Sequence, residues 1–161
     1  MTMLDKYLEP YKTEIQVGID EAGRGCLLGP VFVGAVIWNN DLEHPNLQYI
    51  KDSKKLSKKK RNEMRTFIEE NALAWAVEYC DQTIIDEINI LQATYRAMHK
   101  ALDIIYRNNI KFDRILADGN SFKPFIFNGS KREHSCIING DNRYRQIAAG
   151  SILAKTHRDE Y

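Results

Sequence analysis

The chain has 161 residues, of which 43% are hydrophobic and 28% charged, a composition typical of one globular domain with a real core. Its 23 basic and 22 acidic residues nearly cancel to a formal net charge of +1, so net charge predicts no polyanionic partner. Cys26, Cys80 and Cys136 are odd in number and far apart, which excludes a disulfide framework and a paired-cysteine zinc site. No apolar run approaches the roughly 18–20 residues of a membrane span, and the polar N-terminus does not resemble a signal peptide. We therefore expect a cytoplasmic protein with no membrane partner.

The first half of the chain is predicted to contain three strands and one helix. Alternating apolar residues predict a strand at 14–20, and the β-branched run VFVGAVIW predicts a second, buried strand at 31–38. Ser57 is placed to cap a helix over residues 58–71, and a third strand is predicted at 74–79.

The second half is predicted to alternate helices with short strands. An apolar stripe at helical spacing predicts a long helix over residues 89–107. Short strands follow at 114–117 and 136–138, and a last helix is predicted over 144–161. Closely spaced early strands favour antiparallel pairing, and strands separated by helices favour parallel pairing. The sequence thus predicts an α/β fold with a mixed five-stranded sheet flanked by helices.

Four acidic residues stand at the ends of predicted strands: Asp20, Glu21, Asp118 and Asp141. Strand ends are where loops converge and where sheet proteins tend to place active residues. Neighbours in a strand point to opposite faces, so Asp20 and Glu21 share a site only if the chain turns there, which the following glycines permit. Converging carboxylates repel one another unless a hard divalent cation such as Mg²⁺ neutralises them. The alternative is that each acid is a solvated loop residue, and periodicity alone does not decide.

The glycine-rich segment 21–30 (EAGRGCLLGP) has three interpretations. A dinucleotide-binding loop must open a helix, whereas Pro30 and a β-rich run follow here. A plain glycine turn is the second interpretation. The third is a loop whose exposed backbone amides approach a sugar-phosphate chain, with Arg24 adding a phosphate contact.

A basic run, residues 51–61 (KDSKKLSKKKR), carries seven Lys or Arg in eleven positions. On an exposed helix start, such a run is explained as well by solvation as by binding. Beside a carboxylate–metal site, it would instead attract nucleic-acid phosphates with salt-sensitive affinity.

Five segments together resemble the ribonuclease HII family, the bacterial type 2 ribonucleases H. They are 18–36 (GIDEAGRGCLLGPVFVGAV), 52–57 (DSKKLS), 117–119 (ADG), 140–141 (GD) and 147–159 (IAAGSILAKTHRD). The first is long and highly specific, whereas ADG is weak by itself. The segments occur in the family's order and extend over nearly the whole chain.

The resemblance implies a ribonuclease H-like fold and a function in DNA replication and repair. It implies an endonuclease that hydrolyses the RNA strand of RNA–DNA hybrids and incises at ribonucleotides embedded in DNA, leaving 5′-phosphate and 3′-hydroxyl ends. The implied cofactor is Mg²⁺ or Mn²⁺, and we expect a monomer. The implied catalytic and metal-binding residues are Asp20, Glu21, Asp118 and Asp141.

The resemblance also implies which residues contact nucleic acid. Three residues match the loop that senses the ribonucleotide 2′-hydroxyl, the group that distinguishes RNA from DNA: Gly23, Arg24 and Gly25. Three more lie in segments that line the family's active site: Lys54, Lys55 and Ser151.

Two departures from the family concern the C-terminal part of the chain. The family continues for some tens of residues past the position of Asp159, and that part includes a tyrosine that stacks on a sugar at the RNA–DNA junction. We therefore expect residues 1–161 to form a single catalytic domain without the family's C-terminal segment, and Tyr161 does not take the tyrosine's role. The alternative function is a catalytically impaired hybrid-binding module.

Gly150 replaces a more usual alanine, which costs about 1 kcal/mol in a helix.

Overall fold

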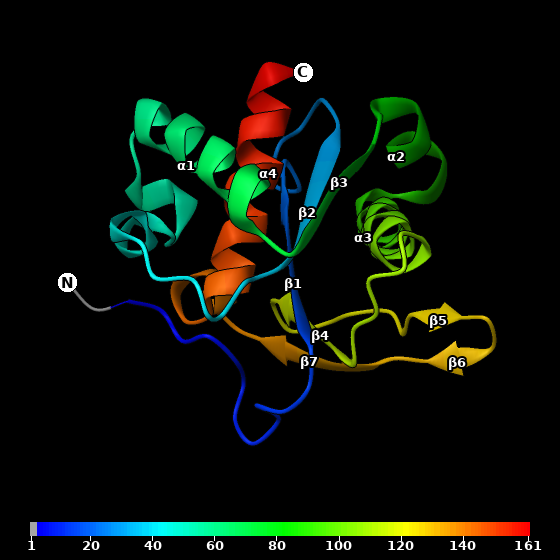
Figure 1. Ribbon diagram of the computed structural model, residues 1–161. Coiled ribbons are helices and arrows are strands. Elements are labelled where there is room, and N and C mark those ends of the chain that lie inside the picture. Colours follow the sequence, from blue (N-terminus) through cyan, green and yellow to red (C-terminus); the bar gives the residue numbers. More distant parts are fainter. Residues whose placement is uncertain (1–2) are drawn as a thin grey trace.

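The computed structural model describes residues 3–161, which form a mixed sheet with helices on both faces (Figure 1). The main sheet has five strands in the order β3-β2-β1-β4-β7. Their bounds are β1 Gln16–Ala22, β2 Val31–Ile37, β3 Ala74–Cys80, β4 Arg114–Asp118 and β7 Glu133–Ile137. The predicted fold class is confirmed.

The sheet changes from antiparallel to parallel at β1, its central strand. β1 pairs antiparallel with β2 and parallel with β4. Pairing with β4 ends at Ile19 opposite Ala117, whereas pairing with β2 continues through Asp20, Glu21 and Ala22. The two acids of β1 therefore lie beyond the end of its ladder with β4.

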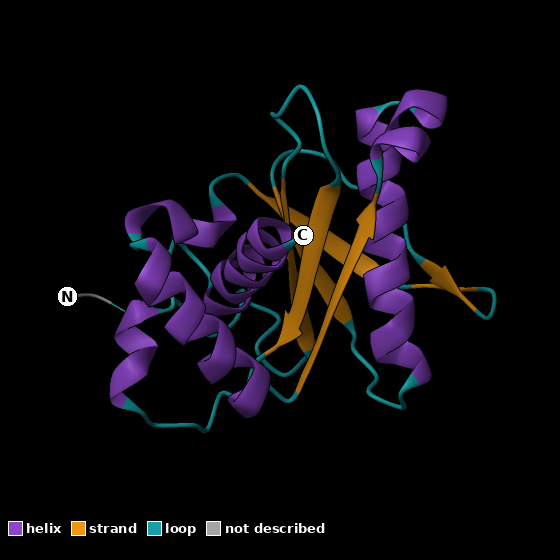
Figure 2. Cartoon of the chain, turned by 90° about the horizontal axis from the view of Figure 1, so that it is seen from above, coloured by secondary structure: helices purple, strands orange, loops and turns teal. Residues whose placement is uncertain are grey.

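The helices form one layer on each face of the sheet (Figure 2). Within the described residues they are α1 Lys58–Asn71, α2 Gln82–Ile88, α3 Ile90–Arg107 and α4 Arg145–Glu160. On one face, α3 packs against β2 and β3; on the other, α4 packs against β1 and β2 and is flanked by α1. Ser57 caps α1 as predicted, since its side chain accepts a hydrogen bond from the Lys60 amide.

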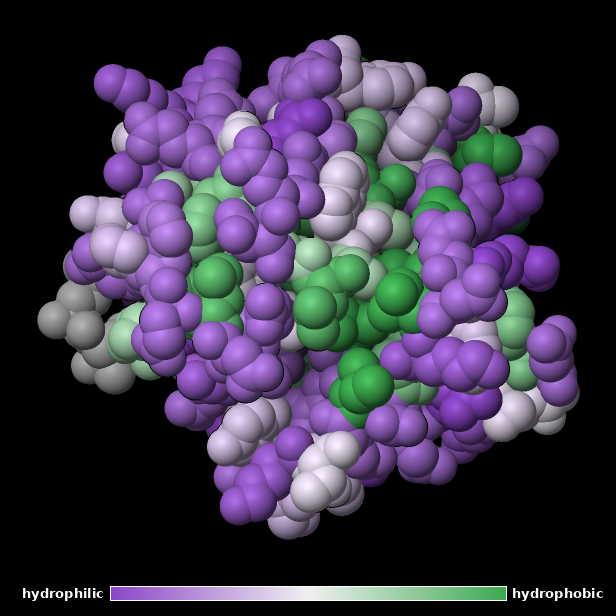
Figure 3. Space-filling view, in the orientation of Figure 1, coloured by the Kyte–Doolittle hydropathy of each residue, from purple (hydrophilic) through white to green (hydrophobic). Residues whose placement is uncertain are grey.

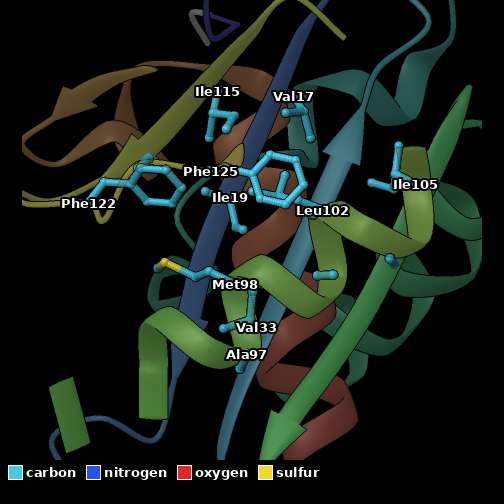
Figure 4. Close-up of a cluster of buried hydrophobic side chains, with 14 of the residues drawn as sticks. Val17, Ile19, Val33, Ala97, Met98, Leu102, Ile105, Ile115, Phe122 and Phe125 are labelled. Atoms are coloured by element: carbon cyan, nitrogen blue, oxygen red, sulfur yellow. The ribbon is translucent and has the colours of Figure 1, made fainter. Parts of the chain in front are cut away.

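The core between α3 and the sheet is built from large side chains on both surfaces (Figure 4). Met98, Leu102 and Ile105 project from α3, and they meet Ile19 and Val33 of the two central strands. Each such fully buried side chain contributes roughly 1.5–3 kcal/mol relative to an exposed one. The same helix face carries small residues that let α3 approach the strands closely: Ala93, Ala97 and Ala101.

On the opposite face, α4 lies against β1 and β2 at a distance that only glycine permits. A Cβ atom added at Gly34 would stand 2.2 Å from the Gly150 carbonyl oxygen, and one at Gly150 would stand 2.6 Å from the Gly34 oxygen. Gly18 meets the backbone of Gln146 in the same way, at 2.3 Å. Gly150 is therefore explained by backbone packing, which offsets its low helix propensity.

Several short elements were not predicted. They are α2, the hairpin β5 Ile126–Phe127 with β6 Ser130–Lys131, and the 3₁₀ turns η1 Pro45–Tyr49, η2 Ser53–Lys55 and η3 Gly140–Asn142. The last strand, β7, begins at Glu133, earlier than the predicted start at residue 136.

The face of the molecule in Figure 3 is mostly hydrophilic, with hydrophobic side chains gathered near its middle. The exposed Ile15, Leu73 and Ile110 line a hollow of about 340 Å³ near the start of β1 and the end of β2. Asp20 stands toward the other end of β1, so this hollow is separate from the acidic residues. Among residues 3–161, no helix has both the length and the apolar character that crossing a membrane requires.

Candidate active site

Asp20 and Glu21 stand where β1 ends and the chain turns. Asp20 is only 5% exposed, and its Oδ1 atom accepts a hydrogen bond from the Glu21 amide at 2.8 Å. Oε2 of Glu21 is buried, and no hydrogen-bond partner for it is found within the described part of the chain. Two residues after Glu21, Gly23 has φ of +95°, a conformation that favours glycine and lets the chain turn where β1 ends.

Asp118 and Asp141 come from the part of the sheet on one side of β1, where β4 pairs with β1 and β7 pairs with β4. Asp118 is the last residue of β4, and Asp141 lies in η3, just after β7. Oδ1 of Asp118 accepts hydrogen bonds from the amides of Gly140 at 2.6 Å and Asp141 at 3.4 Å. These bonds fold the segment after β7 back onto the end of β4, so both acids stand at the same end of the sheet.

The electrostatics show that the four acids share one environment. Burial raises the pKa of Asp20 well above its ordinary value, and the charges of Glu21, Asp118 and Asp141 raise it further. Burial and the Asp118 charge likewise raise the pKa of Asp141, to about 6. The pKa of Glu21 is raised by burial, with the nearby Arg24 opposing the rise. The four acids that the sequence singled out therefore lie near enough to influence one another's ionisation.

The donor set of this cluster suits a hard divalent cation. Its donors are carboxylate oxygens, which Mg²⁺ and Mn²⁺ prefer. A cation would relieve both the mutual repulsion of the acids and the unpartnered Oε2 of Glu21. Within residues 3–161, no three His, Cys, Asp or Glu side chains already stand close enough to count as a preformed metal cage.

The glycine loop between β1 and β2 stands beside the acidic cluster. Nη1 of Arg24 is 3.7 Å from Oε1 of Glu21, which ties the loop to β1. Gly23 and Gly29 both have positive φ, of +95° and +101°. Gly25 does not, and nothing lies within 4 Å of the position its Cβ would take. The backbone at Gly25 is therefore open to close approach by another molecule.

The segment around η2 is attached to the C-terminal part of the site. The hydroxyl oxygens of Ser53 and Ser151 are 3.1 Å apart, and Nζ of Lys55 donates to Oδ1 of Asn142 at 3.0 Å. Ser151 is 6% exposed, and Asn142 directly follows an acid of the cluster. Lys55 and Ser151 are thus placed to hold η2 against η3 and α4.

Asp52 is a member of the site that sequence reasoning missed. Its side chain caps η2 by accepting a hydrogen bond from the Lys54 amide at 3.0 Å, and its charge helps to raise the pKa of Asp141. Nζ of Lys54 stands 3.8 Å from Oδ2 of Asp52, while the lysine side chain is 80% exposed. The signal for Asp52 in the sequence is an acidic residue that opens the turn Ser-Lys-Lys, at a place where no strand is predicted to end.

The basic run is divided between the site and the surface. Lys54 and Lys55 lie at η2, next to the acidic cluster. Lys58 and Lys59 begin α1 and are exposed, and Lys60 forms an ion pair with a glutamate one turn along that helix, at 3.1 Å. Only the first part of the run is thus placed beside the acids.

Comparison with solved structures identifies the fold. The chain superposes on the ribonuclease HII of a PCNA:RNase HII complex from Archaeoglobus fulgidus with a TM-score of 0.67 and 25% identity, over 91% of this chain and 73% of that one. It also superposes on Bst-RNase HIII in complex with Mn²⁺, with a TM-score of 0.61 and 21% identity, over 90% of this chain and 52% of the other.

Comparison of sequences identifies the family more specifically than comparison of folds does. The family model for ribonuclease HII matches residues 17–161. The ribonuclease HII of Porphyromonas gingivalis is 46% identical over 158 residues, which are 98% of this chain and 73% of that protein. The chain belongs to the ribonuclease HII family, whose members are divalent-metal-dependent nucleases that hydrolyse RNA in RNA–DNA hybrids.

Proposed function

We propose that Asp20, Glu21, Asp118 and Asp141 form the catalytic centre of this ribonuclease H and hold Mg²⁺ or Mn²⁺ there. The convergence of these four acids from β1, β4 and η3 is the observation that supports the proposal. Bound cations of this kind activate the attacking water and stabilise the leaving oxygen in phosphodiester hydrolysis.

The residues around the acids supply recognition of the nucleic acid. The open backbone at Gly25 and the half-exposed Arg24 are placed to approach the ribose that carries the 2′-hydroxyl, with Gly23 forming the turn behind them. The exposed Lys54 is placed to contact a phosphate. Lys55 and Ser151 act on this contact indirectly, because they hold η2 in position.

The proposal extends to the substrates and products of the reaction. Recognition of a single ribose by the glycine loop would allow incision at ribonucleotides embedded in DNA as well as in long hybrids. Cleavage would leave 5′-phosphate and 3′-hydroxyl ends. Residues 1–161 would act as one catalytic domain and as a monomer.

A cleavage assay with matched aspartate variants tests the proposal. The substrates are a fluorescent RNA–DNA hybrid and a DNA duplex with one ribonucleotide, each with Mg²⁺, with Mn²⁺ or with EDTA. Asp20→Asn and Asp141→Asn should lower kcat at least about a hundredfold, the scale of losing one electrostatic contact to a transition state. Asp41→Asn, an exposed aspartate outside the cluster, should cleave like the wild type.

Two outcomes would contradict the assignment. Equal cleavage by Asp20→Asn and the wild type would remove Asp20 from the catalytic centre. Salt-sensitive binding of the hybrid by the wild-type chain, without turnover in either metal, would support the impaired binding module instead.

A further inference from the structure

Arg158 reaches from α4 to the far end of the glycine loop. Its Nε donates a hydrogen bond to the Pro30 carbonyl at 2.9 Å, and its Nη2 donates to the Leu28 carbonyl at 3.4 Å. Both acceptors belong to the arm of the loop that leads into β2. The guanidinium therefore fixes the exit of the loop to a helix that is itself packed on the sheet.

The same guanidinium also contacts the entrance of the loop. A Cβ atom at Gly23 would stand 2.2 Å from Nε and 2.9 Å from Cδ of Arg158, and one at Gly29 would stand 3.1 Å from Nη2. Arg158 thus lies between the two arms, where residue 23 begins the loop and residues 28–30 end it. We call this set, Gly23 and residues 28–30, the neck of the loop.

Beyond the neck, the contacts of the loop within the described part of the chain are few: the Cys26 amide donates to the Gly23 carbonyl at 3.2 Å, and the Arg24 guanidinium faces Glu21 at 3.7 Å. Leu27 is 97% exposed, and the position of a Gly25 Cβ has no neighbour within 4 Å. One further anchor comes from Gln82, whose Oε1 accepts the Gly29 amide at 2.9 Å, again at the neck. The path of the outer loop is therefore determined mainly where Arg158 and Gln82 hold its base.

We propose that Arg158 is a positioning residue that fixes the glycine loop in the geometry that selects a ribonucleotide. The inference rests on the proposed role of this loop in sensing the 2′-hydroxyl. The proposal explains why the loop has glycine at two nearby positions. Gly23 leaves room for the Arg158 guanidinium, whereas Gly25 leaves room for the substrate. Arg158 itself touches the loop and not the reacting atoms.

Substitution of Arg158 should therefore affect selectivity more than stability. The substrates are two DNA duplexes, one with a single ribonucleotide and one with the matching 2′-fluoro nucleotide, and kcat and KM are measured for each. Arg158→Met should lower kcat/KM on the ribonucleotide by about 10- to 100-fold, the range for losing hydrogen bonds from a charged donor. The preference for ribose over 2′-fluoro should fall with it. Arg158→Lys keeps the charge but has no planar fork, so its effect should be intermediate.

Two further variants separate the neck from general effects on α4. Lys155→Met breaks the exposed ion pair with Asp159 on the same helix, 3.0 Å long, and should leave both the preference and kcat/KM unchanged. Gln82→Leu removes the second anchor and should reduce the preference in the same direction as Arg158→Lys.

The failure of this inference is distinguishable from failure of the proposed function. If Arg158→Met and Arg158→Lys keep the wild-type preference while the wild type cleaves normally, Arg158 does not position the loop and the function stands. If the wild type shows no preference for ribose, the role of the loop is itself wrong. If Arg158→Met does not fold, the preference for ribose is measured in Arg158→Lys and Gln82→Leu instead. An unchanged preference in both variants contradicts the inference.

Discussion

Asp20 and Asp141 show how a fold can hold like charges at a cost in stability. Both side chains are more than nine-tenths buried, and each is surrounded by other acids. An acid whose pKa is higher in the folded state than its value of about 3.9 in an unfolded chain makes the folded state bind more protons. Ionising such an acid therefore lowers the free energy of unfolding, and a bound cation offsets the loss.

The first prediction follows from the sign of this shift. The pKa of Asp141 is about 6 in the fold, so its destabilising effect is absent below about pH 4, grows between about pH 4 and 6, and is nearly complete above that. In EDTA, Asp141→Asn should therefore gain stability over the wild type by roughly 2–3 kcal/mol at about pH 7.5, and by roughly 1 kcal/mol or less at about pH 4.5. Urea unfolding at both pH values measures the difference. Asp41→Asn is the control, and an equal gain for Asp141→Asn at both pH values would contradict the prediction.

The helices and strands that can be predicted from the sequence are those whose local sequence pattern matches their burial in the fold. The capping residue Ser57 gives the start of α1, and the β-branched run of β2 is buried throughout. The hairpin β5–β6 is not among the predicted elements, although Asn128-Gly129, both with positive φ, is a strong turn signal. Its strands have two residues each, too short for a period to be seen.

The tertiary contacts of these elements cannot be predicted from the sequence alone. Helix propensity suggested that Gly150 is a defect in α4, whereas the structure shows that it permits contact with Gly34. The neighbours Asp20 and Glu21 share a site because pairing with β4 stops before them while pairing with β2 continues. Neither fact follows from periodicity, because each depends on a strand or helix distant in the chain.

Gly150→Ala tests whether packing outweighs propensity. By helix propensity alone, the substitution would stabilise α4 by about 1 kcal/mol. We expect a loss of about 1–3 kcal/mol instead, because the new Cβ would stand 2.6 Å from a backbone oxygen that cannot move without the strand. Chemical denaturation of the metal-free protein measures the change. Gly25→Ala, where the added methyl meets open space, should leave the unfolding free energy unchanged, and a more stable Gly150→Ala protein would refute the packing argument.

The acidic site exists only when parts of the chain that are distant in sequence fold together. Asp20 belongs to the first strand, Asp118 to the fourth, and Asp141 to the segment between the last strand and the last helix. The α4 helix joins these parts, since it packs on β1 and β2 and continues from η3. Binding of a cation to the acids is therefore linked to folding of the whole sheet and not of one segment.

This linkage predicts a metal-dependent melting temperature. At a cation concentration about 100 times Kd, binding adds about 2.7 kcal/mol to the unfolding free energy, which corresponds to a rise of about 5–10 °C for a chain of this size. Asp20→Asn and Asp141→Asn should lose most of this rise, because each removes a ligand of the cation. In EDTA, both variants should melt at a higher temperature than the wild type, because each substitution relieves repulsion between the acids. Thermal unfolding with EDTA, Mg²⁺ and Mn²⁺ measures both effects. Asp41→Asn should behave as the wild type, and an undiminished rise in both cluster variants would place the cation elsewhere on the molecule.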